Sequence, residues 1–215
     1  MELIEQYGPT FAKGLWMTVQ CTLYGSALGL LLGMVIAFCS LSPYRWLKKA
    51  AALYVWLFRG TPFLIQLLIV YSGGPSIGIR LNAFAAGLLT LALFSSAYFS
   101  EIFRAGIAAI NKGHIEAASC LGMSRTAIFT RIVCPPLFLT TMPMLVNTVI
   151  SVLKETVVLS VIVVPELMYQ IQTMAAETFA YIPAMLSMAI LYWVLVEIIA
   201  QAGKRAEKHL GRYRH

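Results

Sequence analysis

The stretch GLWMTVQCTLYGSALGLLLGMVIAFCSL, residues 14–41, decides the fold class of this chain. It contains no Asp, Glu, Lys or Arg. A helix crosses the ~30 Å hydrocarbon core of a bilayer with about 20 apolar residues, so this stretch is long enough to cross at a tilt. Gly25, Gly29 and Gly33 recur every four residues, a spacing that allows a second helix to approach closely. We expect that close approach within the bundle.

Four more apolar segments follow, and lipid forces all five to be helical because it offers no hydrogen-bond partner to free backbone groups. Only 12% of the residues are charged and the mean hydropathy is +0.79, whereas soluble domains carry about 25% charged residues. The sequence therefore predicts an all-α membrane protein with five transmembrane helices in one domain, residues 1–215. The further segments span about 51–71 (interrupted by RGTP at 59–62), 83–107, 137–164 (broken by KET at 154–156) and 182–202.

The distribution of basic residues predicts the orientation in the membrane. Lys and Arg near segment ends favour the cytoplasmic side, and five spans place the termini on opposite sides. With the C-terminus cytoplasmic, only Lys13 and Arg80 lie outside, and the N-terminus is external. The basic tail, 203–215, is then expected to contact anionic lipid, and no nucleic-acid partner is expected. The predicted cytoplasmic residues are Arg45, Lys48, Lys49, Arg104, Lys112, Arg125, Arg131, Lys204, Arg205, Lys208, Arg212 and Arg214.

The chain lacks the motifs of an enzyme or a metalloprotein. Its four cysteines, Cys21, Cys39, Cys120 and Cys134, are far apart and show no zinc or disulfide spacing. No G-x-x-x-x-G-K-[ST] phosphate loop is present, since AGKR at 202–205 lacks the first glycine and the Ser or Thr. We expect no catalytic residues, no metal and no cofactor in this chain.

The polar stretch HIEAASCLGMSRTAIFTRIVCPPL, residues 114–137, lies between two apolar segments in a connector of about 108–136. It predicts a short helix, 114–120, ended by Gly122, whose positive φ allows a tight reversal. Ser124 is expected to cap a second helix, 125–133, which Pro135 and Pro136 stop before the fourth span. Glu116, Ala117 and Ala118 would offer one charge and a small-residue surface. The stretch predicts either a rigid protrusion bound by a separate protein or a hairpin that only connects two spans.

This stretch resembles the cytoplasmic coupling loop of importer-type ABC transporter permeases. The family pattern is Glu-Ala-Ala, three residues, Gly, nine residues, Ile, one residue, Leu, Pro. Glu116-Ala117-Ala118, Gly122, Ile132 and Pro135 match it, and Cys134 replaces the leucine. FRGTP (58–62), AYFSEIFRAGI (97–107), INKGHIEAA (110–118) and LKETVVLSVIVVPEL (153–167) resemble the polar amino-acid permeases of the histidine, arginine and glutamine group. Glu155 and Val157 depart from that group's usual Leu-Lys-Asp-Thr-Ser-Leu.

The resemblance implies the architecture and partners of a type I ABC importer. It implies a multi-pass permease subunit of a bacterial inner membrane, paired with an identical or homologous permease. Two ATPase subunits would bind ATP and Mg, and an external solute-binding protein would deliver a polar amino acid or a related compound. Alternating access would be driven by ATPase subunits that dock on Glu116, Ala117, Ala118, Gly122 and Ser124.

Polar residues in the fourth apolar segment are the candidate substrate path. Asn147, Ser151 and Lys154 share one helical face, and Thr148, Ser151 and Glu155 share an overlapping one. These groups either line the path or pair with charges on neighbouring helices. An alternative function is a self-sufficient secondary transporter or channel that uses Lys154 and Glu155 as a proton relay, although no inverted repeat is visible.

Three other ionisable positions carry expectations. Glu101 and Arg104 are three residues apart and predict an ion pair within one helix. Arg59 is expected to extend to the cytoplasmic surface. Glu166, after Pro165, is expected either to start a short surface helix within 165–181 or to contact the delivering protein.

Overall fold

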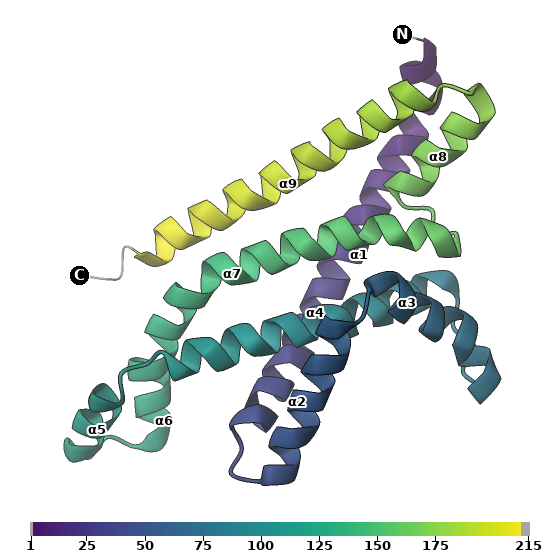
Figure 1. Ribbon diagram of the computed structural model, residues 1–215. Coiled ribbons are helices and arrows are strands. Elements are labelled where there is room, and N and C mark those ends of the chain that lie inside the picture. The colour runs from purple at the N-terminus through teal and green to yellow at the C-terminus, as the bar shows by residue number, and fades with distance from the viewer. Residues whose placement is uncertain (1, 212–215) are drawn as a thin grey trace.

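The computed structural model describes the backbone of residues 2–211 and the side chains of 7–208; Arg212 and Arg214 of the basic tail lie outside the described residues. Within that range the chain is helical and forms no strand, as the sequence predicts (Figure 1). Two π-helical segments (69–73, 129–133) and two 3₁₀ segments (74–77, 156–162) join α-helices. The α-helices are α1 (Glu2–Leu41), α2 (Arg45–Gly60), α3 (Phe63–Leu68), α4 (Ala83–Ala108), α5 (Lys112–Cys120), α6 (Arg125–Ile128), α7 (Cys134–Glu155), α8 (Leu167–Thr178) and α9 (Tyr181–Gly211).

Within the described part of the chain, four helical segments are long and apolar enough to cross a membrane: Tyr7–Leu41, Ala83–Ala108, Arg125–Ile162 and Tyr181–Lys208. The expected second span is not one straight helix, because α2 and the helical segment 63–77 meet at a bend of 107°. Thr61 precedes Pro62 and is extended, with φ −114° and ψ 143°, which is the conformation that a following proline favours. The chain therefore has five spans only if this bent pair is counted as one.

Helix α1 makes its most extensive contact with α4, and Gly25, Gly29 and Gly33 form the contact surface on α1. A Cβ atom on Gly25 would lie 2.9 Å from Leu91 Cβ, and one on Gly33 would lie 2.7 Å from Phe99 Cβ. A Cβ on Gly29 would overlap Ser95 Oγ. The expected close approach within the bundle is confirmed, since all of these neighbours belong to α4.

Helix α7 continues the second helix of the polar connector, so the expected stop at Pro135 and Pro136 is wrong. The two prolines occupy the first positions of α7, where the missing N–H groups matter least. The preceding residues 129–133 form a π-helical turn in which the Cys134 N–H donates to the Phe129 carbonyl. The helix therefore continues from this widened turn through the two prolines. At the other end, α7 stops at Glu155 and a 3₁₀ segment follows, which confirms the predicted break at KET.

The predicted short helix after Pro165 exists, but only one of its faces is at the surface. Leu167, Ile171 and Met174 of α8 are buried in a core shared with α9 and with the N-terminal half of α1. Figure 1 shows α8 lying beside α1 and turning back into α9. Helix α8 is therefore part of the bundle.

We predict that Gly29→Ala destabilises the protein by about 1–3 kcal/mol, the usual cost of overpacking, because its new methyl group overlaps Ser95 on α4. Thermal unfolding of the detergent-solubilised protein measures the effect. Gly8→Ala is the matched control, because a Cβ on Gly8 meets nothing within 4 Å. Equal unfolding temperatures for the two variants would contradict the packing role of Gly29.

Candidate coupling loop and transport cavity

The polar connector between α4 and α7 folds as two short helices joined by a tight turn. The Asn111 side chain caps α5 by accepting from the Gly113 N–H at 2.9 Å, so α5 begins two residues before the expected start. Gly122 has φ +73°, the left-handed conformation expected there. Ser124 Oγ accepts from the Ala127 N–H at 3.2 Å and caps α6, as expected. The connector is therefore held by local hydrogen bonds.

The connector has a small core of its own. Ala118, Ile128 and Val133 are buried together, and they pack against a rim of partly buried apolar residues, Ile110, Ile115, Met123 and Ile132. Glu116 and Ala117 are exposed, and Leu121 is 82% exposed. Of the three residues of the Glu-Ala-Ala motif, Ala118 thus serves packing, and the first two face outward. Sequence reasoning missed Leu121, although an apolar residue directly before the turn glycine is a visible signal.

The candidate path residues on α7 separate into two groups. Ser151 and Glu155 line a cavity of about 160 Å³, together with Thr148 of the same helix. Two aromatic residues of α4, Phe94 and Tyr98, complete its lining. Sequence reasoning missed these two, although their i, i+4 spacing on the third span places them on one helical face.

Asn147 and Lys154 are exposed and do not line this cavity. Ser151 Oγ donates to the Asn147 carbonyl at 3.1 Å, and Glu155 is half-buried. Among residues 7–208 neither Lys154 nor Glu155 takes part in an ion pair. Within this part of the chain, Glu155 is therefore a carboxyl group that faces a cavity without a cationic partner.

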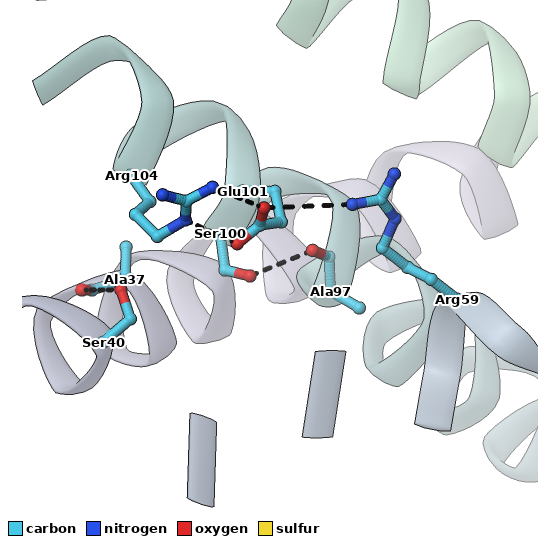
Figure 2. A network of polar contacts seen from close by, with 7 residues as sticks. All are labelled: Ala37, Ser40, Arg59, Ala97, Ser100, Glu101 and Arg104. Atoms are coloured by element: carbon cyan, nitrogen blue, oxygen red, sulfur yellow. Dashed lines mark hydrogen bonds and ion pairs between the residues drawn. The ribbon is translucent and has the colours of Figure 1, made fainter. Parts of the chain in front are cut away.

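A charged network links α2 and α4 (Figure 2). Arg104 binds Glu101 through two hydrogen bonds, Nε to Oε1 at 2.8 Å and Nη2 to Oε2 at 2.9 Å, which confirms the expected pair. Arg59 lies 3.9 Å from Glu101 Oε2, and its guanidinium carbon is 5.2 Å from the centre of the Tyr98 ring. Arg59 is thus held against α4, although 46% of its side chain remains exposed.

Glu166 is completely buried and forms the start of α8, which confirms one of its two expected roles. Its carboxylate accepts from the Met168 and Tyr169 N–H groups, both at 2.8 Å, and from the Tyr192 hydroxyl at 2.9 Å. Thr18 of α1 donates to it at 3.5 Å. The expected contact with a delivering protein is wrong, because the side chain has no accessible surface. Burial raises the pKa of Glu166 to about 7, despite the hydrogen bonds that favour its charged form.

The connector and the cavity lie at opposite ends of one helix. The 22 residues of α7 extend over about 30 Å at 1.5 Å per residue. Figure 1 shows α5 and α6 at one end of α7 and the other α7 end near the turn into α8. Apolar spans, a polar cavity between two of them and a folded connector on a continuous helix define a multi-pass membrane transport component.

The comparison with family models agrees with this class. Residues 29–210 match the model described as binding-protein-dependent transport system inner membrane component, and the chain belongs to this family. The expected membership of the ABC importer permeases is confirmed.

Several relatives match over nearly the whole chain. The arginine transport system permease protein ArtQ of Bacillus subtilis is 36% identical over 203 residues, covering 94% of this chain and 93% of that protein. The putative glutamine transport system permease protein GlnP of Rickettsia conorii is 36% identical over 211 residues, 97% of each chain. The L-cystine transport system permease protein TcyB of Bacillus subtilis is 31% identical over 99% of this chain and 92% of that protein.

Solved structures show the same fold. A crystal structure of an amino acid ABC transporter with histidines has a TM-score of 0.89 and 34% identity, and 96% of each chain is covered. The MetNI methionine ABC transporter in inward-facing conformations has a TM-score of 0.81 at 19% identity, with 96% of this chain and 98% of that chain covered. The expected type I ABC importer permease fold is confirmed.

The raised pKa of Glu166 predicts a pH-dependent stability. Its folded-state pKa of about 7 exceeds the ordinary value of about 4.3, so the folded protein binds this proton more tightly. The stabilisation is fully present below the ordinary pKa and is lost as the pH rises through about 7. We expect the free energy of unfolding to fall more steeply from pH 5 to pH 8 in the wild type than in Glu166→Gln, with slopes that differ by up to about 1.4 kcal/mol per pH unit.

Thermal unfolding of the solubilised protein at pH 5, 6, 7 and 8 measures the two slopes. Glu207→Gln, on the last turns of α9, controls for the loss of a carboxyl group elsewhere. If stability depends on pH with the same slope in the wild type and in Glu166→Gln, Glu166 does not titrate with a raised pKa in the folded protein.

Proposed function

We propose that this chain is the permease subunit of an ATP-driven importer of amino acids or related compounds in a bacterial inner membrane. The observation that carries the proposal is the cavity between α4 and α7, where the Glu155 carboxyl group meets two aromatic rings inside an apolar bundle. A charged group at such a place is costly, and it is therefore a functional-site candidate. Family membership supports the amino-acid class, as do relatives named as permease proteins of arginine, putative glutamine and L-cystine transport systems.

The cavity fits the common part of an amino acid. Glu155 can bind the ammonium group through charge-assisted hydrogen bonds, and the faces of Phe94 and Tyr98 attract a cation. Thr148 and Ser151 donate to carbonyls of their own helix, so their hydroxyl oxygens remain free to accept. A 150 Å³ cavity accommodates benzene, so about 160 Å³ suits a small solute group.

The connector supplies a surface for the energy-providing subunits. Glu116, Ala117 and Leu121 face outward from a connector with its own core, and Gly122 and Ser124 hold its turn. Two ATPase subunits that bind ATP and Mg would dock there and close on ATP binding. Because α6, residues 129–133 and α7 are continuous, a displacement of the connector would reach Ser151 and Glu155.

The remaining assembly follows from the same proposal. A second permease, identical or homologous, would complete the path, and an external solute-binding protein would deliver the amino acid. The N-terminus would lie outside and the connector in the cytoplasm, as the basic residues favour. Alternating access would expose the cavity first to the delivering protein and then to the cytoplasm.

We expect Glu155→Gln to reduce ATP-dependent uptake at least tenfold, because the amide loses the charge that binds the ammonium group; one charge-assisted hydrogen bond accounts for about 1.5–3 kcal/mol. Uptake of radiolabelled L-arginine, L-glutamine and L-cystine by proteoliposomes with the co-purified subunits measures this. Glu197→Gln on α9, outside the cavity, should match the wild type. Undiminished uptake by Glu155→Gln would contradict the role of Glu155 in the substrate path. Uptake driven by a proton gradient without ATP would contradict the assignment as an ATP-driven importer.

Glu116→Lys is predicted to release or uncouple the ATPase subunits, because it reverses an exposed charge on the docking surface. Co-purification of the subunits and the ATPase rate per assembly measure the loss. Glu207→Lys makes the same reversal outside the connector and should retain both. If Glu116→Lys retains full subunit recovery and uptake, Glu116 has no docking role.

A further inference from the structure

We propose that Arg59 is a positioning residue that holds Tyr98 in place as an aromatic wall of the transport cavity. The inference rests on the proposed function for the identity of the cavity as the transport path. Arg59 does not line the cavity, so it acts through the ring.

The guanidinium group of Arg59 covers one face of Tyr98. Its central carbon lies 5.2 Å from the ring centre, within the range of an attractive cation–π contact. The second restraint on Arg59 is loose, since Nη1 is 3.9 Å from Glu101 Oε2. Glu101 already binds Arg104 through two short hydrogen bonds, as Figure 2 shows. The contact with Tyr98 is therefore the one interaction of Arg59 with α4 that Arg104 does not share.

A row of aromatic rings continues from Tyr98 toward the break between α2 and α3. The centres of Tyr98 and Phe94 lie 4.9 Å apart, and those of Phe94 and Phe63 lie 5.3 Å apart in an edge-to-face arrangement. Phe63 is the first residue of α3, and Arg59 lies in the last turn of α2. Both sides of the break thus hold the two rings that line the cavity.

The Gln66 side chain of α3 bridges the break between α2 and α3. Gln66 Nε2 donates to the Phe58 carbonyl at 2.9 Å, to the Thr61 carbonyl at 3.0 Å and to Thr61 Oγ1 at 2.9 Å. Carbonyl groups at the end of α2 therefore have a partner from α3, although the helix ends there. Arg59 extends from a fixed backbone position, which is what a positioning residue requires.

The chemistry favours arginine over lysine at this position. A guanidinium group is planar and stacks on an aromatic face, whereas an ammonium group is a compact charge with a tight hydration shell. Arg59→Lys keeps a positive charge near Glu101 but replaces the guanidinium group over Tyr98 with a compact, strongly hydrated ammonium group. Arg59→Gln loses both. The two variants therefore separate a charge effect from a stacking effect.

The test measures how easily reagents reach the cavity, and it does not depend on transport activity. In a background with Cys21, Cys39, Cys120 and Cys134 replaced by Ala, Ser151→Cys places one thiol in the cavity lining. Its modification rate by a cationic ethylammonium and by an anionic ethylsulfonate methanethiosulfonate reports access to the cavity. We expect Arg59→Gln and Arg59→Lys to change both rates in the same direction by roughly 2- to 5-fold, the equivalent of one cation–π contact. Arg80→Gln, in the turn before α4, is the matched control and should leave both rates unchanged.

A double-variant cycle tests whether the effect passes through the ring. In a Tyr98→Leu background, Arg59→Gln should no longer change the modification rate, because the contact it removes is already absent. Rates that stay at the wild-type value in both Arg59 variants, or a full rescue by Arg59→Lys, would overturn the proposal. So would an undiminished Arg59 effect in the Tyr98→Leu background.

The outcome is separate from that of the proposed function. Failure of the wild-type assembly to take up L-arginine, L-glutamine and L-cystine would remove the importer assignment. The modification rates would still decide whether Arg59 positions Tyr98.

Discussion

The structure depends on one constraint: inside a bilayer every backbone N–H and C=O group needs a partner from the protein itself. Long helices meet it by themselves, and each interruption needs a side chain. Gln66 serves the end of α2, Asn82 and Asn111 cap α4 and α5, and Glu166 caps α8. These four side chains therefore bind backbone groups that the helix ends leave without a partner.

Close packing of α1 on α4 provides the rigid part of the bundle. The glycines at 25, 29 and 33 let two backbones approach, and Ser95 donates to the Gly25 carbonyl at 3.3 Å across the contact. Helix α4 therefore presents Phe94 and Tyr98 from a fixed position. Opposite it, α7 carries Ser151 and Glu155 on the same helix that ends in the connector. The cavity therefore lies between a helix that packs closely on α1 and a helix that continues into the connector.

The ionisable groups of the bundle differ in how they are neutralised. Glu101 is paired with Arg104 and lies near Arg59, and Glu166 is surrounded by hydrogen-bond donors from α1, α8 and α9. Glu155 has no cationic partner among the described residues and faces a cavity. The first two therefore join helices, whereas Glu155 faces the cavity between α4 and α7. That difference identifies the candidate site better than the presence of charge in the membrane does.

Hydropathy and spacing alone determined the helical class and the spans other than the bent second one, because both depend on local periodicity. They also determined the Gly25–Gly33 contact surface and the turn at Gly122 and Ser124, because these depend on local spacing or on the conformation of one residue. Tertiary structure decided the rest. Only packing could show that α7 runs through Pro135 and Pro136, since a π-helical turn absorbs them. Only packing could bring Phe94 and Tyr98 to Glu155 and leave Asn147 and Lys154 outside the cavity. Only packing could bury Glu166. These outcomes depend on which faces are turned toward one another by helices that lie far apart in the chain.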